Sequence, residues 1–274
     1  MKAGIVSTVA SLAVTLAATL AGAPAAAHDH DALAKAAAGE HRTPEYAARD
    51  AARNPVETLQ FLGFDQNLVI VEVSPGGGWY TEILAPAVRD HGQLVAAHFP
   101  ADSTSEYMQR VRGEFVAKLA ANPAVYDQVE VIGYQAGTDN ALGAPGSADL
   151  VLTFRNIHGM IRGGTLDAFL ADAYAVLKSG GRLGIVQHRA PAGADPAAAA
   201  ESGYVPQAWL IEQVEAAGFK LEATSEVNAN PKDTADHPGG VWALPPRLRH
   251  GEENRDKYLA IGESDRMTLR FVKP

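Results

Sequence analysis

Cysteine is absent from this sequence of 274 residues. Its absence excludes disulfide bonds, thiolate metal sites and a cysteine nucleophile. Basic residues are also few, because 23 Lys and Arg stand against 32 Asp and Glu and the formal net charge is −9 at pH 7. A nucleic acid partner is therefore not expected, since binding to a phosphate backbone requires a basic face.

Apolar runs of membrane-spanning length are missing beyond the N-terminus, so no membrane association is expected for the rest of the chain. The N-terminal run, AGIVSTVASLAVTLAATLAG, follows Met1-Lys2 and carries no charge. Ala25 and Ala27 then supply the small-x-small pattern that signal peptidase cleaves. We predict a cleavable signal peptide over 1–27 and a periplasmic or secreted protein, with an uncleaved anchor as the alternative. Residues 28–42 are predicted to be a flexible spacer.

From residue 43 onward, strand and helix patterns alternate. Two helices are predicted to start at Thr43 and Asn54, each of which precedes a proline. Strand-like runs cover 68–73, 94–99, 129–133, 148–154, 178–188, 219–227 and 266–273, and helical spacing covers 79–89, 105–119, 165–177 and 203–217. The order predicts an α/β fold with a doubly wound, mostly parallel, seven-stranded sheet in one domain over 43–274. Within it, 228–262 is predicted as a loop or cap insertion and 190–203 as a mobile loop.

A glycine turn follows the first predicted strand, in the stretch VIVEVSPGGGWYTEIL. Parallel sheets bind ligands at the carboxyl ends of their strands, where such a turn enters a helix. The dinucleotide fingerprint G-x-G-x-x-G/A fits poorly, because Thr81 stands at its third glycine. The acid expected after the next strand is also missing, and His98 occupies its place.

The same stretch resembles motif I of the class I S-adenosylmethionine-dependent methyltransferases, an acid followed by G-x-G-x-G. Glu72 matches the acid, Ser74 stands at the first glycine, and Gly76 and Gly78 match the other two. ADLVLTFRNIH and LKSGGRLGIVQH are similar to the motifs of the fourth and fifth strands, and GESDRMTLRFVKP suits the antiparallel last strand of that Rossmann-like fold. Together with ANPKDTADHPGGVWALPP, these motifs resemble a bacterial group of exported, predicted methyltransferases.

The resemblance implies S-adenosylmethionine as the cofactor. Glu72 is then expected to partner the cationic amino and sulfonium groups, and the backbone between Gly78 and Thr81 is expected to bind the carboxylate. The predicted cofactor site comprises Glu72, Ser74, Gly76, Gly77, Gly78, Tyr80, Thr81, His98 and Gln135. His98 replaces the acid that usually holds the ribose hydroxyls, and Gln135 is the candidate for the adenine.

Candidates for chemistry follow the later strands. Arg155, Asn156 and His158 come directly after the fourth strand, where an acceptor should meet the cofactor. His158 is the first candidate for a general base, because an imidazole titrates near neutral pH. Arg155 is suited to a substrate anion, although it and Asn156 equally suit a structural role. His188, at the end of the fifth strand, is a second candidate base.

Several loop residues are also candidates. Four of them, Tyr204, Asp233, His237 and Trp242, are expected to close over the pocket. Glu263, Asp265 and Arg266 favour a structural ion-pair cluster. A metal held by His98, His158 and His188 is the less favoured interpretation, and no metal site is predicted.

We therefore predict methyl transfer to a small-molecule acceptor. The alternatives are an exported, non-catalytic binding protein on the same fold and a dinucleotide-dependent oxidoreductase. No sequence pattern indicates the oligomeric state.

Overall fold

The computed structural model describes residue 1 and residues 24–138 and 142–274. The predicted signal peptide over 1–27 therefore lies outside the described residues, except for residue 1 and the start of the first helix. None of the described helices is long and apolar enough to cross a membrane.

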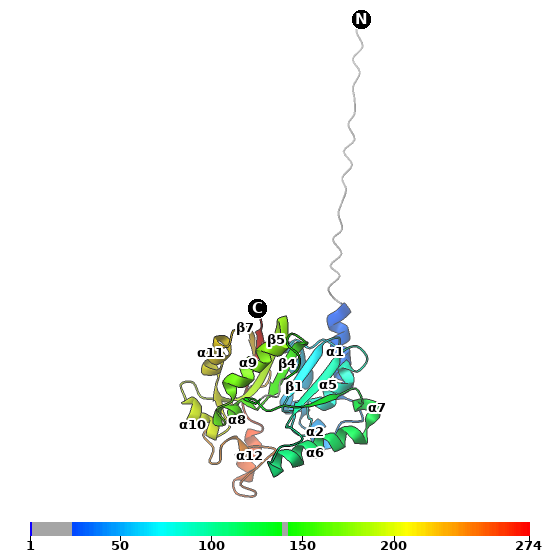
Figure 1. The fold of residues 1–274 in the computed structure, drawn as a ribbon. Helices are drawn as coiled ribbons and strands as arrows, with labels where there is room; N and C mark the ends of the chain where they lie inside the picture. Colours follow the sequence, from blue (N-terminus) through cyan, green and yellow to red (C-terminus); the bar gives the residue numbers. More distant parts are fainter. Residues whose placement is uncertain (2–23, 139–141) are drawn as a thin grey trace.

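One mixed sheet forms the centre of the molecule (Figure 1). Its strands run in the order β3-β2-β1-β4-β5-β8-β7, with a short β6 paired to β5. Only β8 runs antiparallel to its neighbours β5 and β7. The predicted doubly wound sheet with an antiparallel last strand is confirmed, and only the two-residue β6 was not predicted. The strands are β1 (Val69–Val73), β2 (Gln93–His98), β3 (Glu130–Gly133), β4 (Ala148–Phe154), β5 (Leu177–Ala190), β6 (Val205–Pro206), β7 (Lys220–Ser225) and β8 (Arg266–Val272).

Helices cover both faces of the sheet (Figure 1). Alternate residues of β1 serve two cores, since Ile70 packs with one buried cluster while Val71 and Val73 pack with the other. That arrangement explains the continuous apolar run, because a strand buried on both faces has no solvent-facing positions. The first core takes residues from α1, α4, α5 and α6, and the second from α8, α9 and α11.

The helix bounds are close to those predicted in the centre of the chain. The helices are α1 (Pro24–Ala37), α2 (Pro44–Ala47), α3 (Asp50–Arg53), α4 (Pro55–Phe61), α5 (Thr81–Val88), α6 (Glu106–Ala121), α7 (Pro123–Tyr126), α8 (Ile157–Arg162), α9 (Leu166–Val176), α10 (Pro196–Glu201), α11 (Gln207–Ala216) and α12 (Arg255–Ile261), with a 3-10 turn η1 (Gly240–Ala243). Pro206 was expected inside the helix that became α11, but it lies in β6 just before it.

The segment 28–42 was predicted to be a flexible spacer. That prediction is wrong, because the segment contains most of α1 and several of its side chains from residue 31 onward pack against the fold. Helix α1 runs through it, and Leu33 and Ala36 are buried against α4 and α5. The buried Arg42 then forms an ion pair with Glu82 of α5. An alanine-rich, charged sequence looks polar in composition, yet two apolar positions on one helix face are enough to dock it.

The alanine-rich stretch 190–203 is also more ordered than predicted. It contains α10, whose N-terminus is capped by Asp195 accepting from the Ala198 N–H at 2.8 Å. The predicted insertion 228–262 is irregular as expected, but it includes η1 and α12. Thr43 and Asn54 precede helices without capping them, because their side chains bond to Glu82 and to the carbonyl of Val227 instead.

Candidate functional site

The turn after β1 has the backbone conformation that its glycines suggest. Ser74, Gly76 and Gly78 have φ angles of 50°, 61° and 83°. Ser74 thus adopts a left-handed conformation at the position where the methyltransferase motif has glycine, which costs a non-glycine residue strain. A side chain at Gly77 would collide with the Tyr46 hydroxyl, since a Cβ there would lie 2.3 Å from it.

Two cavities open at the carboxyl edge of the sheet, one on either side of Ser74 and Asn156, which line both. We call the first the arginine cavity, and it has a volume of about 340 Å³. Its walls come from the turn after β1, from the N-terminal segment that holds α1 to α3 (24–53), and from the 241–247 loop. The second, of about 410 Å³, is the Gln135 cavity, and its remaining lining residues are Phe99, Met108, Tyr134, Gln135, Ala136, Gly159, Met160, Gly163 and Thr165. Such volumes are in the range of roughly 300–1,000 Å³ typical of small-molecule sites.

Asn156 holds the boundary between the two cavities. Its Nδ2 donates to the Val73 carbonyl at 2.9 Å and lies 3.1 Å from Thr153 Oγ1. These contacts join the end of β4 to the end of β1. The side chain that was predicted to serve either the acceptor or the structure is therefore anchored to the strand ends, with both cavities beside it.

Glu72, the next-to-last residue of β1, is a buried acid that lines the arginine cavity. Its Oε2 accepts from Thr81 Oγ1 at 2.6 Å, so Thr81, itself buried, orients the carboxylate. Burial raises the pKa of Glu72 to about 7, and the Thr81 hydrogen bond opposes that rise only in part. A cationic ligand in this cavity would restore the charge of Glu72.

Among the other predicted cofactor residues, Gly76, Gly77 and Tyr80 line the arginine cavity, and Gln135 lines the other one. Gly78 lines neither, and a Cβ there would press on the ring of Phe115 at 3.1 Å. Tyr80 is buried and stacks on Phe154 with ring centroids 3.6 Å apart. Tyr80 therefore forms part of the wall of the arginine cavity.

His98 is buried behind the glycine turn and lines neither cavity. Its Nδ1 accepts from the Phe99 N–H at 2.8 Å, so Nε2 carries the proton and donates to the Gly76 carbonyl at 3.1 Å. Both ring nitrogens are used to brace the turn. The structure therefore does not bring His98 to where a ribose hydroxyl would lie in either cavity.

His158 and His188 face the arginine cavity together, with ring centroids 6.1 Å apart. Burial lowers the pKa of both imidazoles, and the nearby Arg155 lowers it further. Both rings are consequently neutral at pH 7 and able to accept a proton. Within the described residues, no group of three or more His, Asp or Glu side chains is arranged to bind a metal ion, so the three-histidine interpretation is not supported.

The hydrogen bonds of Gln187 define the tautomer of His158. Its Oε1 accepts from the Ile157 N–H at 3.2 Å, and its Nε2 donates to the Gly203 carbonyl at 3.0 Å. The amide is thereby oriented with Nε2 toward His158 Nδ1, 3.3 Å away. Nδ1 is then the acceptor, and Nε2 of His158 carries the proton. His188 Nδ1 instead contacts the Ser264 hydroxyl at 2.5 Å, a partner that either donates or accepts.

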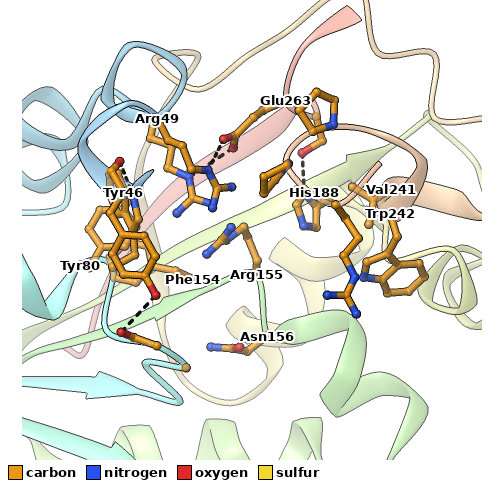
Figure 2. A pocket seen from close by; sticks show the side chains of 18 of the residues that line it. Tyr46, Arg49, Tyr80, Phe154, Arg155, Asn156, His188, Val241, Trp242 and Glu263 are labelled. Atoms are coloured by element: carbon orange, nitrogen blue, oxygen red, sulfur yellow. Dashed lines mark hydrogen bonds and ion pairs between the residues drawn. The ribbon is translucent and has the colours of Figure 1, made fainter. Parts of the chain in front are cut away.

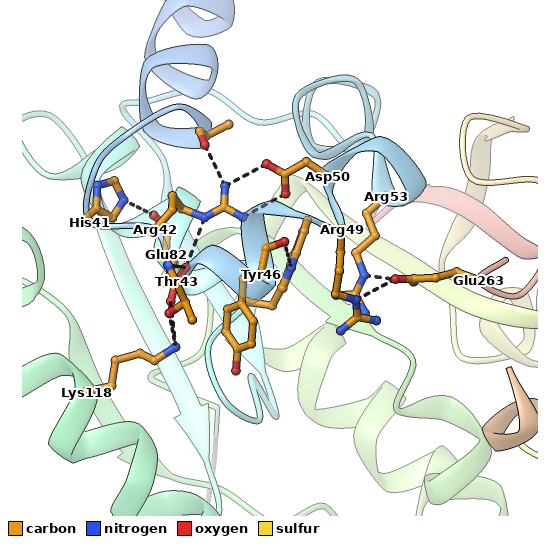
Figure 3. Close-up of polar contacts among 12 residues, drawn as sticks. His41, Arg42, Thr43, Tyr46, Arg49, Asp50, Arg53, Glu82, Lys118 and Glu263 are labelled. Carbon is orange, nitrogen blue, oxygen red and sulfur yellow. Dashed lines mark hydrogen bonds and ion pairs between the residues drawn. The ribbon is translucent and has the colours of Figure 1, made fainter. Parts of the chain in front are cut away.

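Arginines supply the remaining polar wall of the arginine cavity (Figure 2). Arg49 and Arg53 come from the N-terminal segment and both pair with Glu263, at 2.7 and 3.2 Å (Figure 3). Arg266 at the start of β8 also pairs with Glu263, at 3.2 Å. Burial by itself would raise the pKa of Glu263, but the three arginines outweigh it and hold that pKa at about 2.

Arg155 projects into the middle of the same cavity, between Arg49 and Asn156 (Figure 2). Its φ is 65°, and its N–H donates to the Val186 carbonyl at 2.7 Å. Burial lowers the pKa of Arg155 well below its usual value, and Arg53 and Arg266 add to the effect.

The predicted closing loops contribute one of their four named residues to the cavity. Trp242 lines it, whereas Tyr204, Asp233 and His237 form a network behind it. The Tyr204 hydroxyl donates to Asp233 at 3.1 Å, and His237 Nε2 lies 2.8 Å from the same carboxylate. Asp265, named with Glu263 as an ion-pair candidate, binds Arg189 outside the cavity at 2.8 Å.

The N-terminal segment also brings three residues to the site that were not among the predicted ones, namely Tyr46, Arg49 and Arg53. Trp79, which lines the cavity and lies under the Arg53 guanidinium at 4.6 Å, was also missed. The spacing of Arg49 and Arg53, four residues apart, was the available signal, because it indicates two like charges near one face of a turn that needs a counter-charge.

Comparisons with known proteins concern the fold. No protein-family model matches the sequence, and no curated protein matches it. An S-adenosylmethionine-dependent methyltransferase from Aquifex aeolicus aligns over 89% of this chain and 98% of its own, with a TM-score of 0.55 and 16% identity. A putative sarcosine dimethylglycine methyltransferase from Galdieria sulphuraria aligns over 83% and 86%, with a TM-score of 0.55 and 12% identity. The (4+2)-cyclase SpnF aligns over 91% and 94%, with a TM-score of 0.57 and 17% identity.

These likenesses define the class of architecture. The chain has the Rossmann-like fold of S-adenosylmethionine-dependent methyltransferases. A structure described as a cyclase shares it, so the reaction has to be argued from the site.

Proposed function

We propose that this protein transfers a methyl group from S-adenosylmethionine to a small-molecule acceptor. The observation that carries the proposal is the pair of cavities that meet at Ser74 and Asn156, on the carboxyl edge of β1 and β4. The Gln135 cavity suits the nucleoside part of the cofactor, and the arginine cavity suits an acceptor. The junction between them is where the two would meet.

The residues at the junction fit the charges of the cofactor. Glu72 is a buried acid with no basic partner among the described residues, and it suits the amino and sulfonium cations. The N–H groups of Gly76 and Gly77 make no hydrogen bond within the described residues and suit the carboxylate. Gln135 lines the Gln135 cavity, where its amide would face the amino group and ring nitrogens of the adenine. When bound, S-adenosylmethionine supplies an electrophilic methyl carbon, and the electron pair of the broken S–CH₃ bond stays on sulfur.

The protein's part in the reaction is to position the acceptor and to remove its proton. Of the two histidines in the arginine cavity, His188 is the better base. Its Nδ1 is able to donate to Ser264 and so to leave Nε2 bare, whereas His158 carries its proton on Nε2. We therefore assign proton acceptance to His188, and hydrogen-bond donation to the acceptor to His158.

Calorimetry tests the cofactor assignment. The chain from residue 28 onward is titrated with S-adenosylmethionine, with S-adenosylhomocysteine and with nicotinamide dinucleotides. We expect binding of the first two and none of the third. Binding of a nicotinamide dinucleotide alone would overturn the proposal.

A matched pair of glycine variants locates the site. Gly76 lines the arginine cavity, and a Cβ there would meet no protein atom within 4 Å, at φ 61°. Gly146 has the same open surroundings at φ 68° and lies in an exposed turn away from both cavities. Gly76→Val should weaken cofactor binding at least tenfold while Gly146→Val, which carries the same backbone strain, should not. Equal affinities in the two variants would place the cofactor elsewhere.

A further inference from the structure

The arginine cavity carries more positive charge than its own acids neutralise. Its lining includes Arg49, Arg53, Arg155 and Arg247, which supply four positive charges, and Glu72 and Glu263, which supply two negative ones. The difference, four minus two, leaves two positive charges even when Glu72 is ionised. Arg266 pairs with Glu263 from behind and adds to the excess.

Arg53 is one of the groups that carry this excess. Its side chain is 1% exposed, and its Nε pairs with Glu263 at 3.2 Å. Its Nη1 and Nη2 are buried and have no hydrogen-bond partner in the part of the chain that the structure describes. A buried charged donor without an acceptor is destabilising, so two such atoms on one guanidinium indicate a missing ligand. A guanidinium presents its nitrogens as a planar fork, which suits both oxygens of a carboxylate or phosphate.

Arg155 gives a second indication of the same kind. Its guanidinium has no hydrogen bond or ion pair with the described residues, and its backbone holds a left-handed φ of 65°. Strain in a non-glycine residue persists where the surrounding structure enforces a side-chain position. Here that position is the middle of the arginine cavity (Figure 2). Arg53 lines the same cavity.

The cofactor itself does not remove the excess. S-adenosylmethionine carries two cations and one carboxylate, so its binding would add one positive charge to the junction. Its carboxylate also has other donors nearby, in the free N–H groups of Gly76 and Gly77. A second anion is needed, and the acceptor has to supply it.

We infer that the acceptor is a small molecule with a carboxylate or phosphate group, which Arg53 and Arg155 bind. The apolar remainder of the acceptor would lie against Val241, Trp242 and Leu244, which form the facing wall. Its methyl-accepting atom would then point toward His158 and His188. Calling the anion an acceptor rests on the proposed methyl transfer, whereas the anion site itself does not.

Calorimetry on protein saturated with S-adenosylhomocysteine tests the inference. The probes are 3-hydroxybenzoate, its neutral amide 3-hydroxybenzamide, and inorganic phosphate, all at constant ionic strength. We expect the carboxylate to bind at least tenfold more tightly than the amide, and phosphate to bind as well. Arg155→Gln should weaken the carboxylate roughly 10- to 100-fold, as expected for loss of a charge-assisted hydrogen bond. It should leave S-adenosylhomocysteine affinity within about twofold.

Arg182→Gln is the control, because it also removes one guanidinium but from a pair with Glu222 outside the arginine cavity. Arg53→Lys keeps the charge of a buried residue and should lose only part of the affinity, so it guards against a variant that fails to fold. No preference for the carboxylate and no phosphate binding, or equal affinities in Arg155→Gln and Arg182→Gln, would overturn the inference. Loss of S-adenosylhomocysteine affinity in Arg155→Gln would overturn it too, by assigning the arginines to the cofactor. If S-adenosylhomocysteine does not bind at all, the proposed function fails, and the same titrations without it still test the anion site.

Discussion

Glu72 links the charge of the site to the binding of a cation. Its pKa of about 7 means that the carboxyl is mostly protonated at pH 6 and mostly ionised at pH 8. A cationic ligand favours the ionised form, so binding must release a proton wherever free Glu72 is protonated. Ligand affinity should therefore rise with pH across this range.

We predict that the affinity for S-adenosylmethionine rises roughly tenfold from pH 6 to pH 8 because the ionised fraction of Glu72 rises by about that factor. Calorimetry in two buffers of different ionisation enthalpy measures the released proton directly. The Glu72→Gln variant, which keeps the Thr81 contact, should bind more weakly and lose most of the slope. An unchanged slope in this variant would assign the titration to the amine of the ligand.

The tautomer of His158 is a second prediction at the residue scale. Because Gln187 donates to its Nδ1, the ring should be neutral with the proton on Nε2 at pH 6.5 and above. Long-range ¹⁵N–¹H correlation spectra distinguish the two tautomers without any acceptor. A proton found on Nδ1 would contradict the Gln187 geometry and would return His158 to first place as the base.

Once an acceptor turns over, the two histidines should differ in kinetics. His188→Gln should lower kcat by roughly 10²–10⁴-fold, the usual contribution of a positioned base, with cofactor affinity unchanged. His158→Gln should raise the KM of the acceptor more than it lowers kcat, because it loses a hydrogen-bond donor. The opposite pattern would exchange the two roles.

At the scale of elements, the N-terminal segment decides whether the arginine cavity exists. Helix α1 docks it through Leu33, and a polar cluster continues the contact: Glu82 binds Arg42 at 3.2 Å and Lys118 at 2.8 Å (Figure 3). Helices α2 and α3 then carry Tyr46, Arg49 and Arg53 to the cavity. A substitution that weakens the packing of α1 should therefore also displace the arginines of the arginine cavity.

We predict that Leu33→Ala costs about 2–5 kcal/mol of unfolding free energy because Leu33 is fully buried. Leu259→Ala is the matched control, since Leu259 is 46% exposed and its truncation should cost less than about 0.5 kcal/mol. Denaturant unfolding measures both. Similar losses in the two variants would mean that α1 is not docked in solution.

Glu263 is the second point that holds α3. Its pKa is lowered to about 2 in the folded chain, so its stabilising contribution is full above its unfolded pKa near 4.5 and is lost as pH falls from there toward 2. Glu263→Gln should destabilise the fold by about 3–5 kcal/mol, because it leaves the buried Arg53 and Arg266, and the partly buried Arg49, without their counter-charge. The variant should also lose less stability than the parent protein as the pH falls, and thermal melts between pH 3 and 7 measure this. If the two proteins lose stability in parallel, Glu263 does not have this stabilising role.

At the scale of the whole molecule, the predicted export and the proposed cofactor are in tension, because S-adenosylmethionine is made in the cytosol. We predict that the mature chain starts near His28 and is found in the periplasm. Cleavage there would retain Leu33 and Ala36, so the docked part of α1 survives it. Mass spectrometry of the purified protein and cell fractionation test this directly, and an intact Met1 in the cytosolic fraction would contradict it.

The sequence by itself determined the sheet, the glycine turn and the acid at its start. These features are local, because burial on both faces requires the apolar run of β1 and a left-handed turn requires residues such as Gly76. The positions of Arg155 and His158 just beyond β4, and of His188 near the end of β5, also followed from the alternation of elements, since parallel strands end at one edge.

Only the tertiary structure decided which side chains meet. It brought Arg49 and Arg53 to Glu263, more than 200 positions further along the chain. It also used both ring nitrogens of His98 behind the turn. Such contacts depend on how α1, α2 and α3 pack across α5 and β8, and packing is set by the shapes and charges of distant surfaces. No local period or motif encodes that information, so a segment that looked like a spacer became one wall of the site.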